Sequence, residues 1–271
     1  MTAQIISAVP VPFTTDGGLD LPEFEAALRA IDAHVDGVLI AGTTGEFPAL
    51  DDSERVIAHL GHGSTRQVLR LAEATAAEGI TRFALLSPYY LPTDDDGVVA
   101  FYRALTEAYP HASVYAYLFP ERTGMDVSVD VLRRILELPG MVGVKLSGGA
   151  TTRLSEYAAV LREGQELYSG DDSTLPFVLA EGGTGIVSGV SSAFPETFSA
   201  LVRALETGDA DAIERAQAAA VCVVGLAGPT ITRLKAALAA RSGAAWASRM
   251  ALPVVDAELH SQIAAAVAQH G

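Results

Sequence analysis

Short runs of β-branched and apolar residues alternate along the chain with longer segments rich in alanine and leucine. The short runs have the length of strands, and the longer segments space their apolar residues as amphipathic helices do. The runs are almost continuously apolar, which is typical of parallel strands buried on both faces. Eight strands are therefore predicted, at Ile5–Val11, Gly37–Ala41, Val56–Leu60, Arg82–Leu86, Ser113–Tyr117, Val142–Leu146, Glu166–Tyr168 and Gly185–Ser188.

Helical patterns lie between and after these strands. Regular alternation of strand and helix predicts a parallel sheet with right-handed crossovers. Eight such units predict a closed (β/α)8 barrel, the TIM-barrel fold. The barrel helices are expected at Leu21–His34, Ser64–Glu78, Gly97–Tyr109, Ser128–Leu136, Thr152–Glu163, Leu175–Ala180 and Pro195–Glu206.

The chain stays helical after the eighth unit. Three further helices are expected at Asp209–Leu226, Pro229–Ala240 and Asp256–Gln269. Asp209 suits a helix cap, and Pro229 suits the first turn of a helix. We therefore divide the chain into a barrel over residues 1–206 and a C-terminal helical extension over residues 207–271.

The connection between the second and third strands is short for a barrel. Only Gly42 to Arg55 join them, whereas a parallel crossover needs about a dozen residues or more and usually a helix. Asp51–Arg55 supplies one helical turn at most. Either the second barrel helix is truncated in this protein or the chain lacks a segment here, and the sequence leaves both open.

Composition limits the class of protein. The 271 residues are 49% hydrophobic and 19% charged, which supports a sizeable core. The net charge of −15 repels phosphate backbones and anionic lipid, so neither nucleic acid nor a membrane surface is expected as a partner. The start of the chain lacks the pattern of a signal peptide, and we expect a cytoplasmic protein. Cys222 is the only cysteine and is expected in the core.

Lys145 is the first candidate for chemistry. It ends the sixth predicted strand, and catalytic groups of this fold lie at the carboxyl ends of strands. Desolvation in an apolar strand favours the neutral amine, which attacks carbonyl carbons to form Schiff bases. A salt-bridged or snorkelling lysine is the alternative. Lys235, the only other lysine, lies on a predicted C-terminal helix and is expected to be a surface charge.

Two other strand ends carry suitable groups. The second strand leads into Gly42–Glu46, whose glycines and hydroxyls can hold a small carboxylate or simply form a tight turn. Tyr115 and Tyr117 share one face of the fifth strand, where a tyrosine can relay protons. Arg122 follows them and can bind a carboxylate through two hydrogen bonds. Core tyrosines and a surface arginine are the alternative.

Several of these segments, taken in order, resemble the dihydrodipicolinate synthase / N-acetylneuraminate lyase family over about residues 4 to 205. The resemblance implies a (β/α)8 barrel with added C-terminal helices, and a class I lyase or aldolase that handles pyruvate without a metal or other cofactor. It also implies a homo-oligomer, commonly a tetramer. The segments that carry it are Gly42–Glu46, Pro88–Tyr90, Tyr117–Gly124, Gly143–Lys145 and Ser169–Asp172.

The resemblance also implies catalytic roles. Lys145 would form the imine with pyruvate or another 2-keto acid. Tyr117 would be the acid and base near C3 and the bond that is cleaved. Thr43 would complete a hydroxyl relay with Tyr117 and with Tyr90, the latter from a neighbouring subunit.

The remaining expected roles concern binding of the substrates. Thr44 and Gly45 would hold the pyruvate carboxylate, and Val187 at the end of the eighth strand would line the same pocket. Arg122 would bind the carboxylate of the second substrate, which in the synthase branch is aspartate semialdehyde.

Two departures from the family pattern leave the second substrate open. Leu118 stands where the family usually has asparagine, and Leu146 stands where it often has glutamate. They suggest a less polar pocket, so a 2-keto-3-deoxy sugar acid or an aryl-substituted keto acid is the alternative substrate.

Two further readings compete with imine chemistry. His59 and His62, close together at the end of the third strand, could belong to a metal-dependent aldolase. The barrel could also bind a keto acid without catalysis, with the short second crossover as a mark of lost activity.

Overall fold

The computed structural model describes residues 2–40 and 55–271. Its strands form one closed barrel in the order of the chain, and the pairs from β3 to β8 are parallel. The predicted (β/α)8 barrel is confirmed. The strands are β1 (Gln4–Ala8), β2 (Gly37–Ile40), β3 (Val56–His59), β4 (Arg82–Leu86), β5 (Ser113–Leu118), β6 (Met141–Leu146), β7 (Glu166–Ser169) and β8 (Gly185–Ser188).

Helices follow the strands and continue after the barrel. Several of the longer helices begin at a side-chain cap: Asp209, for example, accepts hydrogen bonds from the Asp211 and Ala212 amides, as its sequence position predicts. The helices are α1 (Leu21–Ile31), η1 (Asp32–His34), α2 (Thr65–Ala77), α3 (Asp95–Ala108), α4 (Pro120–Thr123), α5 (Val129–Leu136), η3 (Gly148–Arg153), α6 (Leu154–Ala158), α7 (Leu175–Ala180), η4 (Val190–Ser192), α8 (Pro195–Thr207), α9 (Ala210–Ala227), α10 (Ile231–Ser242) and α11 (Ala257–His270).

Several boundaries differ from those predicted, three of them as follows. β1 ends at Ala8 rather than at Val11, because the prolines at 10 and 12 have no N–H to donate to a ladder. The helix expected over Thr152–Glu163 is replaced by η3 and a short α6. Pro229 lies just before α10, whose cap is Thr230, so it is not in the first turn.

The chain divides into two compact units. The first contains, of the described residues, 2–38 and 188–271, and the second contains 39–40 and 55–187. The division predicted between residues 206 and 207 stays a prediction.

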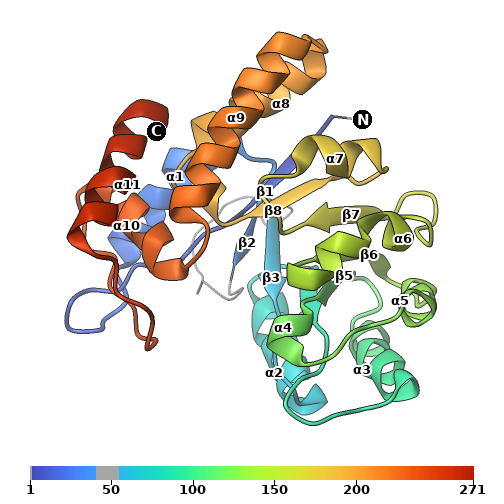
Figure 1. Ribbon diagram of the computed structural model, residues 1–271. Coiled ribbons are helices and arrows are strands. Elements are labelled where there is room, and N and C mark those ends of the chain that lie inside the picture. The colour runs from blue at the N-terminus through green and yellow to red at the C-terminus, as the bar shows by residue number, and fades with distance from the viewer. Residues whose placement is uncertain (1, 41–54) are drawn as a thin grey trace. The chain divides into compact units, whose positions relative to one another are not determined.

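The second unit carries strands β3 to β7 with their helices. Neighbouring helices pack against one another, α2 on α3, α3 on α5, and α5 on α6, and they run along the outside of these strands (Figure 1). Side chains of strands that are not neighbours meet on the inner face, as His59 of β3 meets Tyr117 of β5. Alternation along the strands therefore places Tyr115, Tyr117 and Lys145 on this inner face.

The first unit carries the C-terminal helices. α9, α10 and α11 pack together, and α8 packs on α9. Glu196 of α8 forms an ion pair with Arg241 of α10, and Trp246 donates a hydrogen bond to Glu23 of α1 at 2.9 Å. These contacts hold residues far apart in sequence within one unit.

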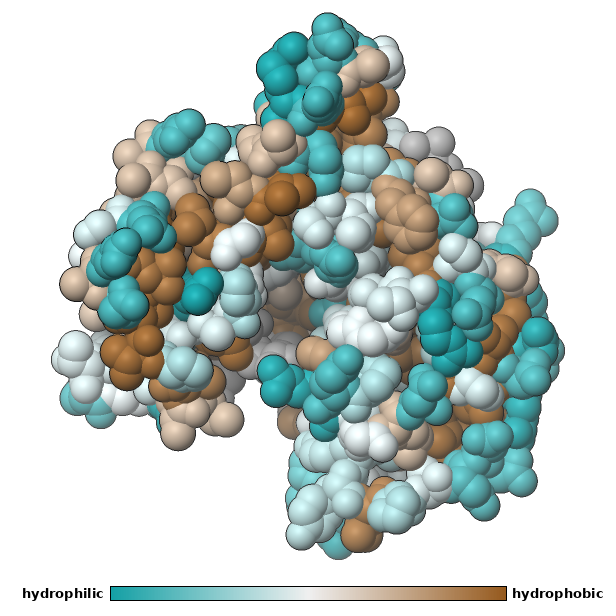
Figure 2. Space-filling view, in the orientation of Figure 1, coloured by the Kyte–Doolittle hydropathy of each residue, from teal (hydrophilic) through white to brown (hydrophobic). Residues whose placement is uncertain are grey.

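Two expectations about these helices are wrong. Cys222 is exposed, because α9 turns Ala220, Val223 and Ala227 inward and leaves its neighbouring apolar residues outside. Apolar side chains reach the surface over this group of helices (Figure 2). Lys235 is only 5% exposed: its Nζ donates to the Ala247 carbonyl at 2.6 Å and lies 4.8 Å from the centre of the Phe13 ring.

The short connection between β2 and β3 falls mostly on residues 41–54, so the predicted truncation of the second helix lies outside the described residues. In the part of the chain that is described, no single helix combines the length and apolar character of a membrane span. The pair α9 and α10, bent by 110°, meets that criterion only when both are counted together, by length and composition.

Candidate active site

Lys145 lies inside the second unit, at the carboxyl end of β6. Its side chain is 8% exposed, and its Nζ lies 4.1 Å from the centre of the Tyr117 ring. The register pairs Tyr117 of β5 with Lys145, and Lys145 with Tyr168 of β7. Three neighbouring strands thus bring an amine and two phenols to the same level of the barrel.

Tyr117 is packed on several sides. It is 3% exposed. The Phe119 ring lies 6.1 Å from its ring centre, and the His59 imidazole meets it at 5.6 Å with the planes at 72°. Packing on these sides restrains the Tyr117 ring beside Lys145, which suits a group that moves protons at a defined atom.

A polar network lies one level nearer the amino ends of the strands. Gly143 of β6 has no side chain there, and a Cβ would come within 2.2 Å of the Glu166 carbonyl oxygen. Across it, the Tyr115 hydroxyl of β5 donates to Glu166 of β7 at 2.5 Å. Arg82 donates to Tyr115 at 2.5 Å, and the Tyr168 hydroxyl donates to Glu166 at 3.1 Å.

Sequence reasoning missed this network. The sequence does contain a feature that could have predicted it: Arg82 and Glu166 are charged residues at the first position of largely apolar strands. Alternation puts both on the face of Tyr115, where a charge needs a partner.

Buried tyrosines make the protein sensitive to alkali. Burial raises the pKa values of Tyr102, Tyr115 and Tyr168 well above their ordinary range. Above pH of about 10 the unfolded chain loses phenolic protons that the native state keeps, so stability falls as pH rises, by about 1.4 kcal/mol per pH unit for each such tyrosine. Burial lowers the pKa of Lys235 to about 8, which has the opposite effect, but only up to its unfolded pKa of about 10.4.

We therefore expect the free energy of unfolding in urea to drop steeply between about pH 10.5 and about pH 11.5. In the Tyr102→Phe variant, the free energy of unfolding should fall less steeply with pH, by the contribution of one tyrosine. A slope equal in the variant and the native protein would contradict this origin.

Arg122 and Glu121 lie beyond the strand ends. Arg122 of α4 is exposed, and its guanidinium lies over the Phe119 ring at 5.4 Å. Glu121 accepts a hydrogen bond from the Gly149 amide at 2.7 Å, and a side chain at Gly148, which has φ of 57°, would collide with it. The loops after β5 and β6 are therefore tied together beside Arg122, whose cationic end stays accessible to an anion.

Leu118 and Leu146 do not bear on the polarity of the inner site. They form a register pair between β5 and β6 and are buried at 2% and 0% exposure. Each follows a residue that faces inward, so alternation puts both on the outer face of the barrel. The less polar pocket inferred from them is wrong, because these side chains point away from it.

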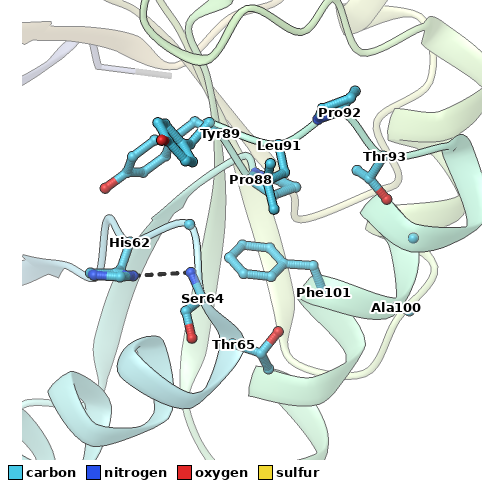
Figure 3. Close-up of a pocket in the computed structure, with 13 residues that line it drawn as sticks. His62, Ser64, Thr65, Pro88, Tyr89, Leu91, Pro92, Thr93, Ala100 and Phe101 are labelled. Carbon is cyan, nitrogen blue, oxygen red and sulfur yellow. Dashed lines mark hydrogen bonds between the residues drawn. The ribbon is translucent and has the colours of Figure 1, made fainter.

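Tyr90 is not packed inside the barrel with Tyr117. Its side chain is 91% exposed and its φ is +79°, a conformation that is rare outside glycine. Tyr90 and its neighbours border an open cleft of about 630 Å³ between the loops that follow β3 and β4 (Figure 3). On the opposite side of the cleft, the Ser64 amide donates to His62 at 3.0 Å.

Of the other expected site residues, the structure describes Val187 alone. Val187 is buried at 6% exposure in β8. Thr43, Thr44 and Gly45, expected to hold the pyruvate carboxylate and to relay protons, lie outside the described residues.

The described part of the chain does not support a metal site at His59 and His62. Among residues 2–40 and 55–271 no group of three or more His, Cys, Asp or Glu side chains is placed to hold a metal ion. His59 lies against Tyr117, whereas His62 is exposed and accepts a hydrogen bond from Ser64.

A closed parallel barrel with its candidate groups at the carboxyl ends of the strands defines the class, that of (β/α)8-barrel enzymes. The Dihydrodipicolinate synthetase family model matches residues 1–269. The chain belongs to this family of carbon–carbon lyases, as its motifs predicted.

Known relatives agree. The chain is 33% identical over 233 residues to the 4-hydroxy-tetrahydrodipicolinate synthase of Methylococcus capsulatus, covering 78% of this chain and 79% of that protein. The structure of the same-named enzyme from Methylacidiphilum fumariolicum SolV is 26% identical, has a TM-score of 0.86, and covers 100% of this chain and 96% of that one. A monomeric dihydrodipicolinate synthase variant has the same fold, with a TM-score of 0.87, 22% identity and coverage of 99% and 96%.

Proposed function

We propose that this protein is a class I aldolase that forms a Schiff base between Lys145 and pyruvate, and that it condenses pyruvate with aspartate semialdehyde as a 4-hydroxy-tetrahydrodipicolinate synthase. The observation that carries the proposal is the Lys145 amine, buried in the barrel with its Nζ 4.1 Å from the centre of the Tyr117 ring. Membership of the family supports it, as does the name of the relative from Methylococcus capsulatus.

The proposed chemistry needs few groups. The neutral amine of Lys145 attacks the keto carbon of pyruvate, water leaves, and a protonated imine forms. The imine nitrogen draws electrons from C3, so C3 can lose a proton and then attack an aldehyde carbon. Tyr117 takes the C3 proton and returns a proton to the product. This sequence calls for no cofactor.

Reduction with borohydride in the presence of pyruvate tests the proposal. The chain has only two lysines, so intact mass and peptide mapping give a simple result. We expect one reduced pyruvyl group, on Lys145, with Lys235 unmodified as the internal control. A folded protein with no adduct, or with the adduct on Lys235, would refute the proposal and favour a barrel that binds keto acids without catalysis.

The second substrate depends on Arg122. Its exposed guanidinium beyond the end of β5 is suited to the carboxylate of aspartate semialdehyde. Loss of a charge-assisted pair costs about 1.5–3 kcal/mol, so Arg122→Ala should lower kcat/KM for the semialdehyde by about 10- to 150-fold. Steady-state kinetics with pyruvate held at saturation measures this.

The same experiment weighs the alternative substrates. Full activity of Arg122→Ala with aspartate semialdehyde would contradict the assignment of Arg122 to the carboxylate of this substrate. A native protein that turns over 2-keto-3-deoxy sugar acids or aryl-substituted keto acids faster would favour an aldolase of those compounds. The matched control is Arg103→Ala, which removes an arginine on helix α3.

We also propose that the protein acts as a homo-oligomer and that Tyr90 meets a second copy. Support comes from the exposed Tyr90 and Leu91, at 91% and 72%, and from the positive φ of Tyr90. A strained and exposed aromatic tip of this kind is typical of a contact surface.

A further inference from the structure

His59 is the last residue of β3 and faces the inside of the barrel. The register pairs it with Ala84 of β4, and pairs Ala84 with Tyr115 of β5. Ala84 contributes only a methyl group to this row, which leaves room beside it on the inner face. The imidazole of His59 is partly buried in that region.

The loop after β3 is shaped around this imidazole. A Cβ at Gly61 would lie 2.1 Å from Cε1, 2.8 Å from Nε2 and 2.9 Å from Nδ1 of His59. Those distances are far below contact distance for all three atoms, so only a glycine at position 61 leaves the ring where it is. The close approach of the His59 ring to the backbone at position 61 therefore depends on Gly61.

Tyr117 is the aromatic neighbour of the same imidazole. The two rings are 5.6 Å apart with an interplanar angle of 72°, which is the edge-to-face geometry that aromatic pairs prefer. Tyr117 in turn lies with its ring centre 4.1 Å from Lys145 Nζ. A chain of direct contacts thus runs from Gly61 through His59 to Tyr117 and Lys145, all within the second unit.

We propose that His59 is a positioning residue for Tyr117. The His59 ring, which packs against Gly61, holds the Tyr117 phenol in the orientation from which its hydroxyl reaches C3 of the imine formed at Lys145. This inference rests on the proposed function. In this role, His59 itself touches neither the imine nor C3. Removing it should therefore slow the proton transfer at C3 and leave imine formation unchanged.

Two measurements with pyruvate alone separate these steps. Proton NMR in D2O follows the exchange of the pyruvate methyl protons for deuterium, which requires imine formation and then proton transfer at C3. Borohydride trapping reports imine formation only. The variants are His59→Ala, which removes the ring, His59→Phe, which keeps a ring, and Gly61→Ala, which displaces the ring.

A matched control is His111→Ala, since His111 is exposed in the loop before β5, at the amino end of that strand. We expect His59→Ala and Gly61→Ala to lower the maximal exchange rate about tenfold. The amount of trapped adduct and the apparent KM for pyruvate should stay unchanged. His59→Phe should recover most of the lost rate, and His111→Ala should behave as the native protein.

Each other outcome is informative. Native exchange in His59→Ala would overturn the inference, and so would a fall in exchange that is matched by a fall in trapped adduct. Failure of His59→Phe to recover any rate would overturn it too, because a ring at position 59 would then not suffice. Absence of adduct in the native protein would instead refute the proposed function. Thermal unfolding shows whether each variant is folded, and the Gly61→Ala variant keeps the test open if His59→Ala does not fold.

Discussion

Replacing Lys145 with methionine is expected to abolish both the borohydride-trapped adduct and the exchange of pyruvate methyl protons. Methionine has a similar length and no amine, so it fills the inner site beside Tyr117 while removing the nucleophile. The lost covalent route is worth on the order of 10³-fold or more in exchange rate, because an oriented amine reacts as if at very high local concentration. Proton NMR in D2O and intact mass measure the two losses.

The other lysine serves as the control within the same chain. Lys235 is buried in the first unit, where it donates a hydrogen bond to the Ala247 carbonyl, so its amine is already engaged. Burial lowers the pKa of Lys235 to about 8, so part of its amine is neutral near neutral pH and would react with pyruvate if pyruvate reached it. An adduct that persists in Lys145→Met would move the chemistry to Lys235 and contradict the assignment.

The barrel could be predicted from sequence because parallel strands buried on both faces leave a strong local signal. Residues such as Val38, Leu39 and Ile40 of β2 are apolar at consecutive positions and all buried, and turns and caps separate each run from the next helix. The sequence signal fails where contacts between distant segments determine the local conformation. The predicted helix Thr152–Glu163 does not reach its expected end, because Arg162 and Gln165 donate to the Leu136 carbonyl on either side of a turn at Gly164, whose φ is 82°.

The C-terminal helices show a second limit of the sequence. Their apolar residues surround much of the helix surface, so periodicity does not say which face is buried. Cys222 consequently looked like core and is exposed. Lys235 looked like a surface charge and is buried, because a carbonyl from residue 247 and the ring of Phe13 come to it from elsewhere in the chain.

Part of the site could be predicted from the order of the strands. Tyr117 and Lys145 end adjacent parallel strands, and adjacency with matching register brings them together. The network of Tyr115 with Glu166 could not be foreseen in the same way. It joins β5 to β7 across Gly143 of β6, where a Cβ would collide with the Glu166 backbone, and only the register reveals this arrangement.

Tyr117→Phe is expected to separate imine formation from proton transfer. The variant keeps the ring beside Lys145 and loses only the hydroxyl, so pyruvate should still be trapped by borohydride. Removing a positioned acid and base costs about 10²- to 10⁴-fold, so the exchange of methyl protons should fall by that factor. Exchange at the native rate would show that another group takes the C3 proton.

Tyr115→Phe is the matched control, because it removes the same hydroxyl two residues earlier on the same face of β5. That hydroxyl donates to Glu166 and accepts from Arg82, so its loss should lower the free energy of unfolding by about 1–3 kcal/mol. It should leave trapping and exchange near their native values. A comparable loss of exchange in both variants would indicate that the inner polar network, and not the Tyr117 hydroxyl alone, supports the chemistry at C3.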